Sequence, residues 1–161
     1  MRPGRSVRFR SPESGFTLLA LLVVMFVVAL GLSAAGPGWH DQNRRAKERE
    51  LMRVGALYAH ALAEFRESAP GSLKTYPRSL DELVLDSRFL GVRRHLRRLY
   101  PDPLDPARPW GLVRDADGYI VAVYSQSPDE PVAAGPVDLG DIVLAPAHRY
   151  SNWKFSPPSP P

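Results

Sequence analysis

The sequence predicts an α+β protein in which a long N-terminal helix packs on a small antiparallel β-sheet. Three patterns along the chain carry this prediction. Residues 16–35 are an apolar run, residues 41–67 carry an apolar stripe at helical spacing, and residues 110–125 hold two β-rich segments around a turn. A length of 161 residues suits one domain of this kind.

The first helix is predicted from the run over residues 16–35, whose polar members are Thr17 and Ser33. A helix of this length spans roughly 30 Å, the thickness of a bilayer's hydrocarbon core. The run is apolar on every face, whereas a surface helix of a globular domain has one apolar stripe. It is also longer than the apolar part of an ordinary signal peptide, which is about 7–15 residues. We therefore predict a transmembrane segment over residues 16–35.

The charge of the chain is concentrated at its start. Arginines 2, 5, 8 and 10 against Glu13 give residues 1–15 a charge of +3, out of a formal net charge of +4 for the whole chain. If this segment is removed, the rest of the chain is nearly neutral, and its overall charge no longer favours a polyanionic partner. The absence of cysteine excludes a disulfide framework, a thiolate metal site and a cysteine nucleophile.

A second helical stretch is predicted from Asp41 to about Glu67, with Asp41 as its N-terminal cap. Its apolar residues recur at spacings of three and four and should face a core. They are Leu51, Val54, Tyr58, Leu62 and Phe65. The opposite, polar face is expected to carry Arg45, Glu48, Arg49, Arg53 and Glu64. His60 is expected to be a partly exposed helical residue and no ligand.

Residues 79–99 are predicted to hold a short helix followed by an arginine cluster. The sequence Ser79-Leu80-Asp81-Glu82 matches a capping box, so we expect a helix over residues 80–86. Residues 88–99 then contain five arginines interleaved with apolar residues. Arg93, Arg94, Arg97 and Arg98 are the candidate partner-binding residues. The cluster is interpreted as an amphipathic turn whose arginines face solvent or acidic neighbours, with phosphate binding as the alternative.

The sheet is predicted in the C-terminal half. Residues 100–106 are too rich in proline for a helix or a central strand and should form a rigid connector. Residues 110–114 and 119–125 read as strands joined by the turn Asp115-Ala116-Asp117-Gly118. We expect a last strand over residues 150–155 and a disordered, proline-rich tail over residues 156–161.

The junction Gly15-Phe16-Thr17-Leu18-Leu19, after a short basic leader, resembles the processing motif of the type IV pilin and pseudopilin family. The resemblance implies that a prepilin peptidase removes residues 1–15 by cutting after Gly15, and that Phe16 is then methylated. It also gives Phe16, Thr17, Ala20 and Pro37 roles in assembly. Pro37 matches the place where these helices often carry a proline, and it should kink or loosen the helix.

Ala20 departs from the family pattern. The family has a glutamate four residues after the new N-terminus, which is thought to pair with the terminal amine of the adjoining subunit. A carboxylate in hydrocarbon is costly unless it is paired, so that partnership would guide insertion. A subunit at the filament tip has no predecessor to pair with. The resemblance therefore implies a minor, tip-proximal or initiating subunit, with a tolerated substitution in an ordinary subunit as the alternative.

The order of helix, connector and small sheet is similar to that of type II secretion pseudopilins, in the branch related to the major pseudopilin. The residues that carry this likeness are Tyr76-Pro77, Leu80, Leu83, Tyr100-Pro101-Asp102-Pro103, Trp110-Gly111, Val123-Tyr124-Ser125 and Tyr150-Ser151-Asn152-Trp153-Lys154-Phe155. It implies a single-pass inner-membrane protein whose globular domain, residues 36–155, lies in the periplasm. The implied partners are other pilin subunits, the prepilin peptidase and the inner-membrane assembly platform, in a periplasmic or surface filament driven by a separate ATPase.

No catalytic constellation is found in the sequence, so we expect a structural subunit, with no enzymatic activity and no cofactor. Histidines 40, 60, 95 and 148 are isolated, without helical metal-ligand spacing. Asp138 and Asp141 cannot fill a calcium shell of about six to eight oxygens, so no metal is expected. Two alternatives stay open. One is a secreted soluble binding protein cut after Ala35. The other is a DNA-binding competence pilin, which would require an exposed, contiguous arginine cluster; we expect no nucleic-acid partner.

Overall fold

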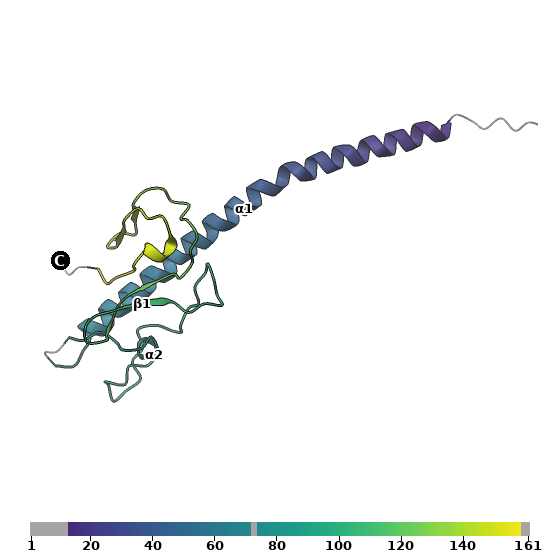
Figure 1. Cartoon of the computed structure of the whole chain (residues 1–161). Helices are drawn as coiled ribbons and strands as arrows, with labels where there is room; N and C mark the ends of the chain where they lie inside the picture. The colour runs from purple at the N-terminus through teal and green to yellow at the C-terminus, as the bar shows by residue number, and fades with distance from the viewer. Residues whose placement is uncertain (1–12, 72–73, 159–161) are drawn as a thin grey trace, which may run out of the picture. The chain divides into compact units, whose positions relative to one another are not determined.

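The structure, a computed structural model, describes residues 13–71 and 74–158, without the side chains of residues 13–14 and 32–40. It confirms the α+β class with a long N-terminal helix and small antiparallel sheets (Figure 1). The elements are helix α1 (Glu13–Glu67), helix α2 (Asp81–Val84), strands β1 (Gly111–Arg114), β2 (Ile120–Tyr124), β3 (Val137–Asp138) and β4 (Val143–Leu144), and the 3₁₀-helix η1 (Tyr150–Asn152). The chain divides into two compact units, residues 1–42 and 43–161.

Helix α1 is a single element of 55 residues. The helix predicted over residues 41–67 is confirmed as the second half of this element, but the predicted cap is wrong, because Asp41 lies inside α1 and caps nothing. Helix propagation is far easier than nucleation, so long helical segments on both sides favour continuation between them. Pro37 lies within this continuous helix, but its side chain falls outside the described ones, and the predicted kink stays a prediction.

The apolar stripe of α1 forms the core of the second unit, as predicted. Leu51, Tyr58 and Leu62 are fully buried, and Val54 and Phe65 are nearly so. The side chains that cover this stripe come from α2, the strands and the C-terminal segment. They include Leu83, Leu96, Trp110, Ile120, Val123, Ile142, Leu144, Tyr150, Trp153 and Phe155. His60 is about half exposed, also as predicted.

The predicted hairpin is confirmed. β1 pairs antiparallel with β2, with Gly111 opposite Tyr124 and a bulge between Val113 and Arg114. In the turn, the Asp115 carboxylate accepts hydrogen bonds from the backbone N–H groups of Asp117 (3.0 Å) and Tyr119 (2.8 Å). Gly118 has a φ of +84°, a left-handed conformation that suits glycine. The prediction of a rigid connector before β1 fits the structure, since residues 100–106 form neither helix nor strand.

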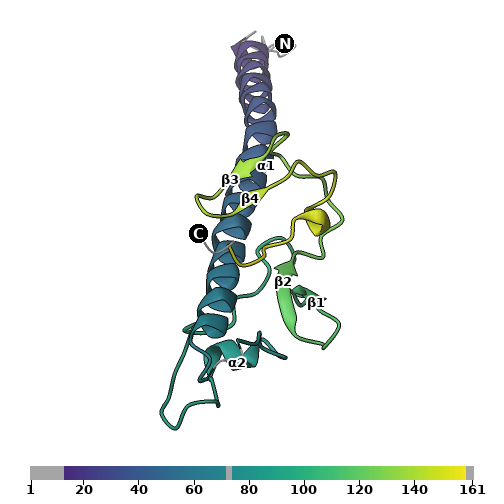
Figure 2. The same ribbon diagram turned by 90° about the vertical axis from the view of Figure 1, so that its left-hand side faces the viewer.

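A second hairpin, β3–β4, is not anticipated by the sequence. Each strand has two residues, with Val137 opposite Leu144. The hairpin lies against α1 (Figure 2), where Asp141 is 3.5 Å from His60 of the helix. Strands this short carry too little alternation for a period-two pattern to be recognised.

The prediction of a last strand over residues 150–155 is wrong in its first half. Residues 150–152 form the 3₁₀-helix η1, and Phe155 makes an isolated antiparallel bridge with Val123 of β2. Tyr150 and Trp153 are both buried. Residues three apart share a face in a 3₁₀-helix but point to opposite faces of a strand. Burying both aromatic rings in one core therefore favours the helical turn.

Helix α2 is shorter than the predicted span of residues 80–86. It begins at Asp81, with Leu80 at the cap position and no capping side-chain hydrogen bond. The Glu82 half of the predicted capping box is present, because its carboxylate accepts from the backbone N–H of Ser79 at 3.2 Å. Residues 159–161 of the predicted disordered tail lie outside the described residues.

Candidate functional site

The first half of α1 exposes an apolar surface. From Gly15 to Gly31 every residue is exposed, and the large apolar side chains lie on all faces of the helix. Phe16, at the start of this segment, is 75% exposed. Monomeric soluble proteins rarely expose contiguous apolar patches larger than a few hundred Å². Such a segment is stable when lipid or other apolar helices cover it.

Within residues 13–71 and 74–158, no helix combines the length and hydropathy of a membrane-crossing segment.

The structure places the predicted processing and assembly residues Gly15, Phe16, Thr17 and Ala20 together in the first turns of α1. An added Cβ at Gly15 would meet nothing within 4 Å, and its backbone has no positive φ. Nothing in the described part of the chain therefore requires glycine there. Residues 1–12 of the predicted leader lie outside the described residues.

The comparison with protein families gives the decisive match for this end of the chain. Residues 10–36 match the prokaryotic N-terminal methylation motif. This methylation motif indicates a type IV pilin-like prepilin that a prepilin peptidase processes, and it contains Gly15, Phe16, Thr17 and Ala20. Comparison with curated proteins finds no match, and comparison with solved structures finds none either.

Beyond the methylation motif, a buried carboxylate joins α1 to the C-terminal segments. Glu48 is only 5% exposed, so its predicted place on the polar face is wrong. Its carboxylate accepts from the backbone N–H groups of Val132 (2.6 Å) and Ala133 (3.1 Å), and from the Tyr150 hydroxyl (2.6 Å). Burial and the bond to Glu48 raise the pKa of the Tyr150 phenol. Glu48 lies three residues before Leu51, so helical spacing alone places it on the apolar stripe.

A second buried cluster surrounds Asp86, just after α2. The Arg88 guanidinium donates to its carboxylate through Nε (2.9 Å) and Nη2 (2.7 Å), and Nε2 of His95 lies 3.1 Å from Oδ2. Burial opposes ionisation of Asp86, but the hydrogen bonds from Arg88 and His95 outweigh it and lower its pKa from 3.8 to about 2. His95 is therefore not isolated, contrary to the sequence analysis, and Nδ1 of its ring faces Glu64 of α1 at 3.5 Å.

The same cluster holds the end of α1. Nη2 of Arg88 also donates to the backbone C=O of Phe65 at 2.7 Å, and the guanidinium lies 3.5 Å from the centroid of the Phe65 ring. The last carbonyls of a helix have no partner within the helix, and a cation there is favourable. Arg88 is thus a structural member of the predicted arginine cluster.

The other predicted partner-binding residues face solvent. Arg93, Arg94, Arg97 and Arg98 are all exposed. The Arg93 guanidinium lies 4.8 Å from the centroid of the Phe89 ring, and that of Arg98 lies 5.1 Å from the centroid of the Tyr100 ring. The prediction that these arginines face solvent is correct, although the segment forms no helix.

A buried pair fixes the proline-rich connector. Asp102 is fully buried and accepts from the Ser125 hydroxyl at 2.5 Å and from the backbone N–H of Leu104 at 2.9 Å. The Tyr58 hydroxyl of α1 donates to the backbone C=O of Tyr100 at 3.0 Å. These bonds satisfy polar groups that would otherwise be costly to bury. No local sequence pattern predicts them, because the partners are far apart in the chain.

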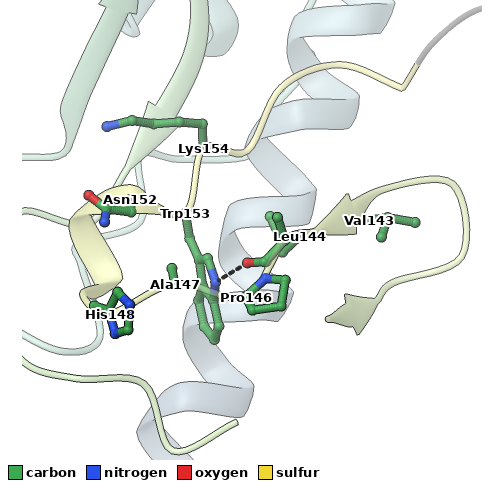
Figure 3. Close-up of a pocket in the computed structure, with 9 residues that line it drawn as sticks. Val143, Leu144, Pro146, Ala147, His148, Asn152, Trp153 and Lys154 are labelled. Atoms are coloured by element: carbon green, nitrogen blue, oxygen red, sulfur yellow. Dashed lines mark hydrogen bonds between the residues drawn. The ribbon is translucent and has the colours of Figure 1, made fainter. Parts of the chain in front are cut away.

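A cavity of about 320 Å³ lies between β4 and the C-terminal segment (Figure 3). Trp153 forms one of its walls, and its indole Nε1 donates to the backbone C=O of Ala145 at 3.0 Å. The Lys154 ammonium lies 3.1 Å from the centroid of the Tyr124 ring and donates to the C=O of Ser151 at 2.7 Å. The indole N–H of Trp153 and the ammonium of Lys154 are therefore both engaged by the protein itself.

Proposed function

We propose that this chain is a minor structural pseudopilin of a type II secretion or type IV pilus-like filament. The observation that carries the proposal is the methylation motif at residues 10–36, which leads into a helix with exposed apolar side chains from residue 15 to residue 31. The motif supplies the processing site, and the apolar segment supplies the surface through which subunits associate. The prepilin peptidase cuts after Gly15 and leaves Phe16 as the methylated N-terminus.

The apolar segment serves the subunit before and after assembly. Before assembly, residues 16–35 hold it in the inner membrane, with residues 36–155 in the periplasm. In the filament, the same segment packs against its equivalents in neighbouring subunits. A helix that is apolar on every face is stable both in lipid and among other apolar helices, because both cover its apolar surface. Its partners are then other pilin subunits, the assembly platform and the prepilin peptidase.

Ala20 places the subunit at the filament tip in this proposal. The tip subunit has no predecessor whose terminal amine needs a carboxylate partner, and an alanine avoids an unpaired charge in an apolar bundle. Immunogold labelling of filaments tests this point. We expect gold at the tip for the wild type and along the filament for Ala20→Glu; gold along the filament in both would contradict the tip role.

Intact-mass and N-terminal analysis of protein from membranes tests the function itself. With the host's prepilin peptidase, we expect a chain that begins at Phe16 and carries one added methyl group; without the peptidase, we expect the precursor. Gly15→Val should leave the precursor uncut. Gly31→Val is the matched control, since Gly31 lies in the same helix with equally open space around it, and this variant should be processed normally.

A chain that begins at Gly36 and is free in the periplasm would contradict the proposal, and would instead indicate a secreted soluble protein.

A further inference from the structure

Residues 87–99, called the arginine loop here, are rich in cationic groups that the fold leaves unneutralised. The loop contains five arginines and no acidic residue. The acids on either side, Asp86 and Asp102, are buried and hydrogen-bonded within the protein. Arg88 forms an ion pair with Asp86. Among the ion pairs of the described residues, none involves Arg93, Arg94, Arg97 or Arg98.

The tip of the arginine loop is apolar and uncovered. Leu90 is fully exposed and Val92 is 74% exposed. The Arg93 guanidinium lies over the Phe89 ring, so a cation sits directly beside these apolar side chains. Moving exposed aliphatic side chains out of water lowers the free energy. The loop tip therefore combines apolar side chains with adjacent unpaired cations.

The base of the loop is fixed while its tip is free. Arg88 binds Asp86 and the end of α1 through the C=O of Phe65. At the other end, Leu96 is buried, and the backbone N–H groups of His95 and Leu96 donate to the C=O of Leu83 at 2.9 and 2.8 Å. Both ends are thus anchored to the helices, and the tip is presented to a partner without folding first.

We propose that the arginine loop binds the surface of an anionic phospholipid bilayer. Guanidinium groups pair with lipid phosphates, while Leu90 and Val92 enter the apolar region just below. A bilayer needs no shape-matched groove, and the loop offers a protruding tip. A single-stranded nucleic acid fits less well, because the large apolar side chains exposed at the tip, Leu90 and Val92, have no aromatic ring on which bases could stack.

A fluorescent label at the loop tip tests this proposal on the full chain. The chain has no cysteine, so Gly91→Cys can be labelled uniquely with an environment-sensitive nitrobenzoxadiazole dye. An added Cβ at Gly91 meets nothing within 4 Å. Gly135→Cys, equally open, is the control label. Each labelled chain is mixed with vesicles of phosphatidylcholine, or of equal parts phosphatidylcholine and phosphatidylglycerol.

We expect the label at residue 91 to become brighter and blue-shifted with the anionic vesicles, and the label at residue 135 to stay unchanged. Arg93→Gln with Arg94→Gln should lower the ratio of inserted to exposed loop about 30-fold, from the attraction of each guanidinium to an anionic lipid surface. Leu90→Ser should lower it about tenfold. The same change of charge at Arg108 and Arg149, outside the loop, should leave the ratio unchanged.

Three results would overturn the proposal. The first is an equal response at residue 91 with neutral and anionic vesicles. The second is an equal response at residues 91 and 135, which would reflect association through another part of the chain. The third is an unchanged response in Leu90→Ser, which would identify a surface for soluble polyanions, such as nucleic acid or an acidic protein. Because the dye reports only its own surroundings, vesicle association through the apolar half of α1 does not imitate the expected result.

Discussion

Replacing Asp86 by asparagine should make the stability of the globular unit less dependent on acid pH. Asp86 is buried, both of its carboxylate oxygens accept hydrogen bonds from Arg88, and Nε2 of His95 lies 3.1 Å from Oδ2. Burial opposes its charge, but these partners more than compensate and lower its pKa from 3.8 to about 2. Asparagine keeps the shape of the side chain and removes the charge. The variant therefore isolates the contribution of the ionised carboxylate.

The size of the effect follows from the pKa. A pKa that is lower in the folded state means that the ionised form stabilises the fold, and that this stabilisation is lost as pH falls through the folded value. The fall from 3.8 to about 2 corresponds to roughly 2–3 kcal/mol in the free energy of unfolding. This contribution is complete above about pH 5 and disappears progressively down to about pH 2.

Urea unfolding of the full chain in a non-ionic detergent measures this contribution of Asp86 to the free energy of unfolding. The fluorescence of the buried Trp110 and Trp153 is the signal. At pH 7 we expect Asp86→Asn to be less stable than the wild type by about 2–3 kcal/mol, with the difference closing toward pH 2. Asp117→Asn, at an exposed acid in the β1–β2 turn, is the control and should follow the wild type. A difference that is constant with pH, or absent, would refute the reasoning.

Two further changes test contacts to the C-terminal segment. In Glu48→Gln, an amide replaces a carboxylate that accepts three hydrogen bonds, so the free energy of unfolding should fall by about 1–3 kcal/mol. Tyrosine absorbance titration should also show a lower pKa for Tyr150, and an unchanged value would contradict its assignment to Glu48. In Gly55→Ala, the new Cβ would lie 2.4 Å from the Phe155 ring. Urea unfolding should show a loss of about 1–3 kcal/mol from overpacking, absent in Gly135→Ala, and equal stability of the two variants would disprove the close contact.

Local patterns predicted the parts of the fold that local physics determines. The stripe from Leu51 to Phe65 follows helical spacing and is buried as expected. The turn at residues 115–118 contains the aspartate and glycine that its backbone requires, and the strands on both sides are confirmed. The methylation motif at residues 10–36 could likewise be identified from the sequence, because its signal lies within a few neighbouring residues.

Several of the wrong predictions involve contacts formed only in the folded structure. Glu48 is buried because backbone N–H groups more than eighty residues later reach its carboxylate. Residues 150–152 form a 3₁₀-helix because the rings of Tyr150 and Trp153 are both buried in the same core. His95 contacts Asp86, and no sequence motif indicates this contact. These conformations and contacts depend on tertiary packing, which local propensity does not encode.

The bridge between Phe155 and Val123 also determines when the globular unit can fold during synthesis. The ring of Phe155 lies against Gly55 in the C-terminal half of α1, and Tyr150 and Trp153 enter the same core. These aromatic residues lie far beyond the stripe in the sequence, so the stripe of α1 stays uncovered until they have left the ribosome. Contacts between such distant residues form slowly, and exposed apolar surface favours aggregation in the meantime. A nascent chain stalled before residue 150 would therefore be sensitive to protease and dependent on chaperones.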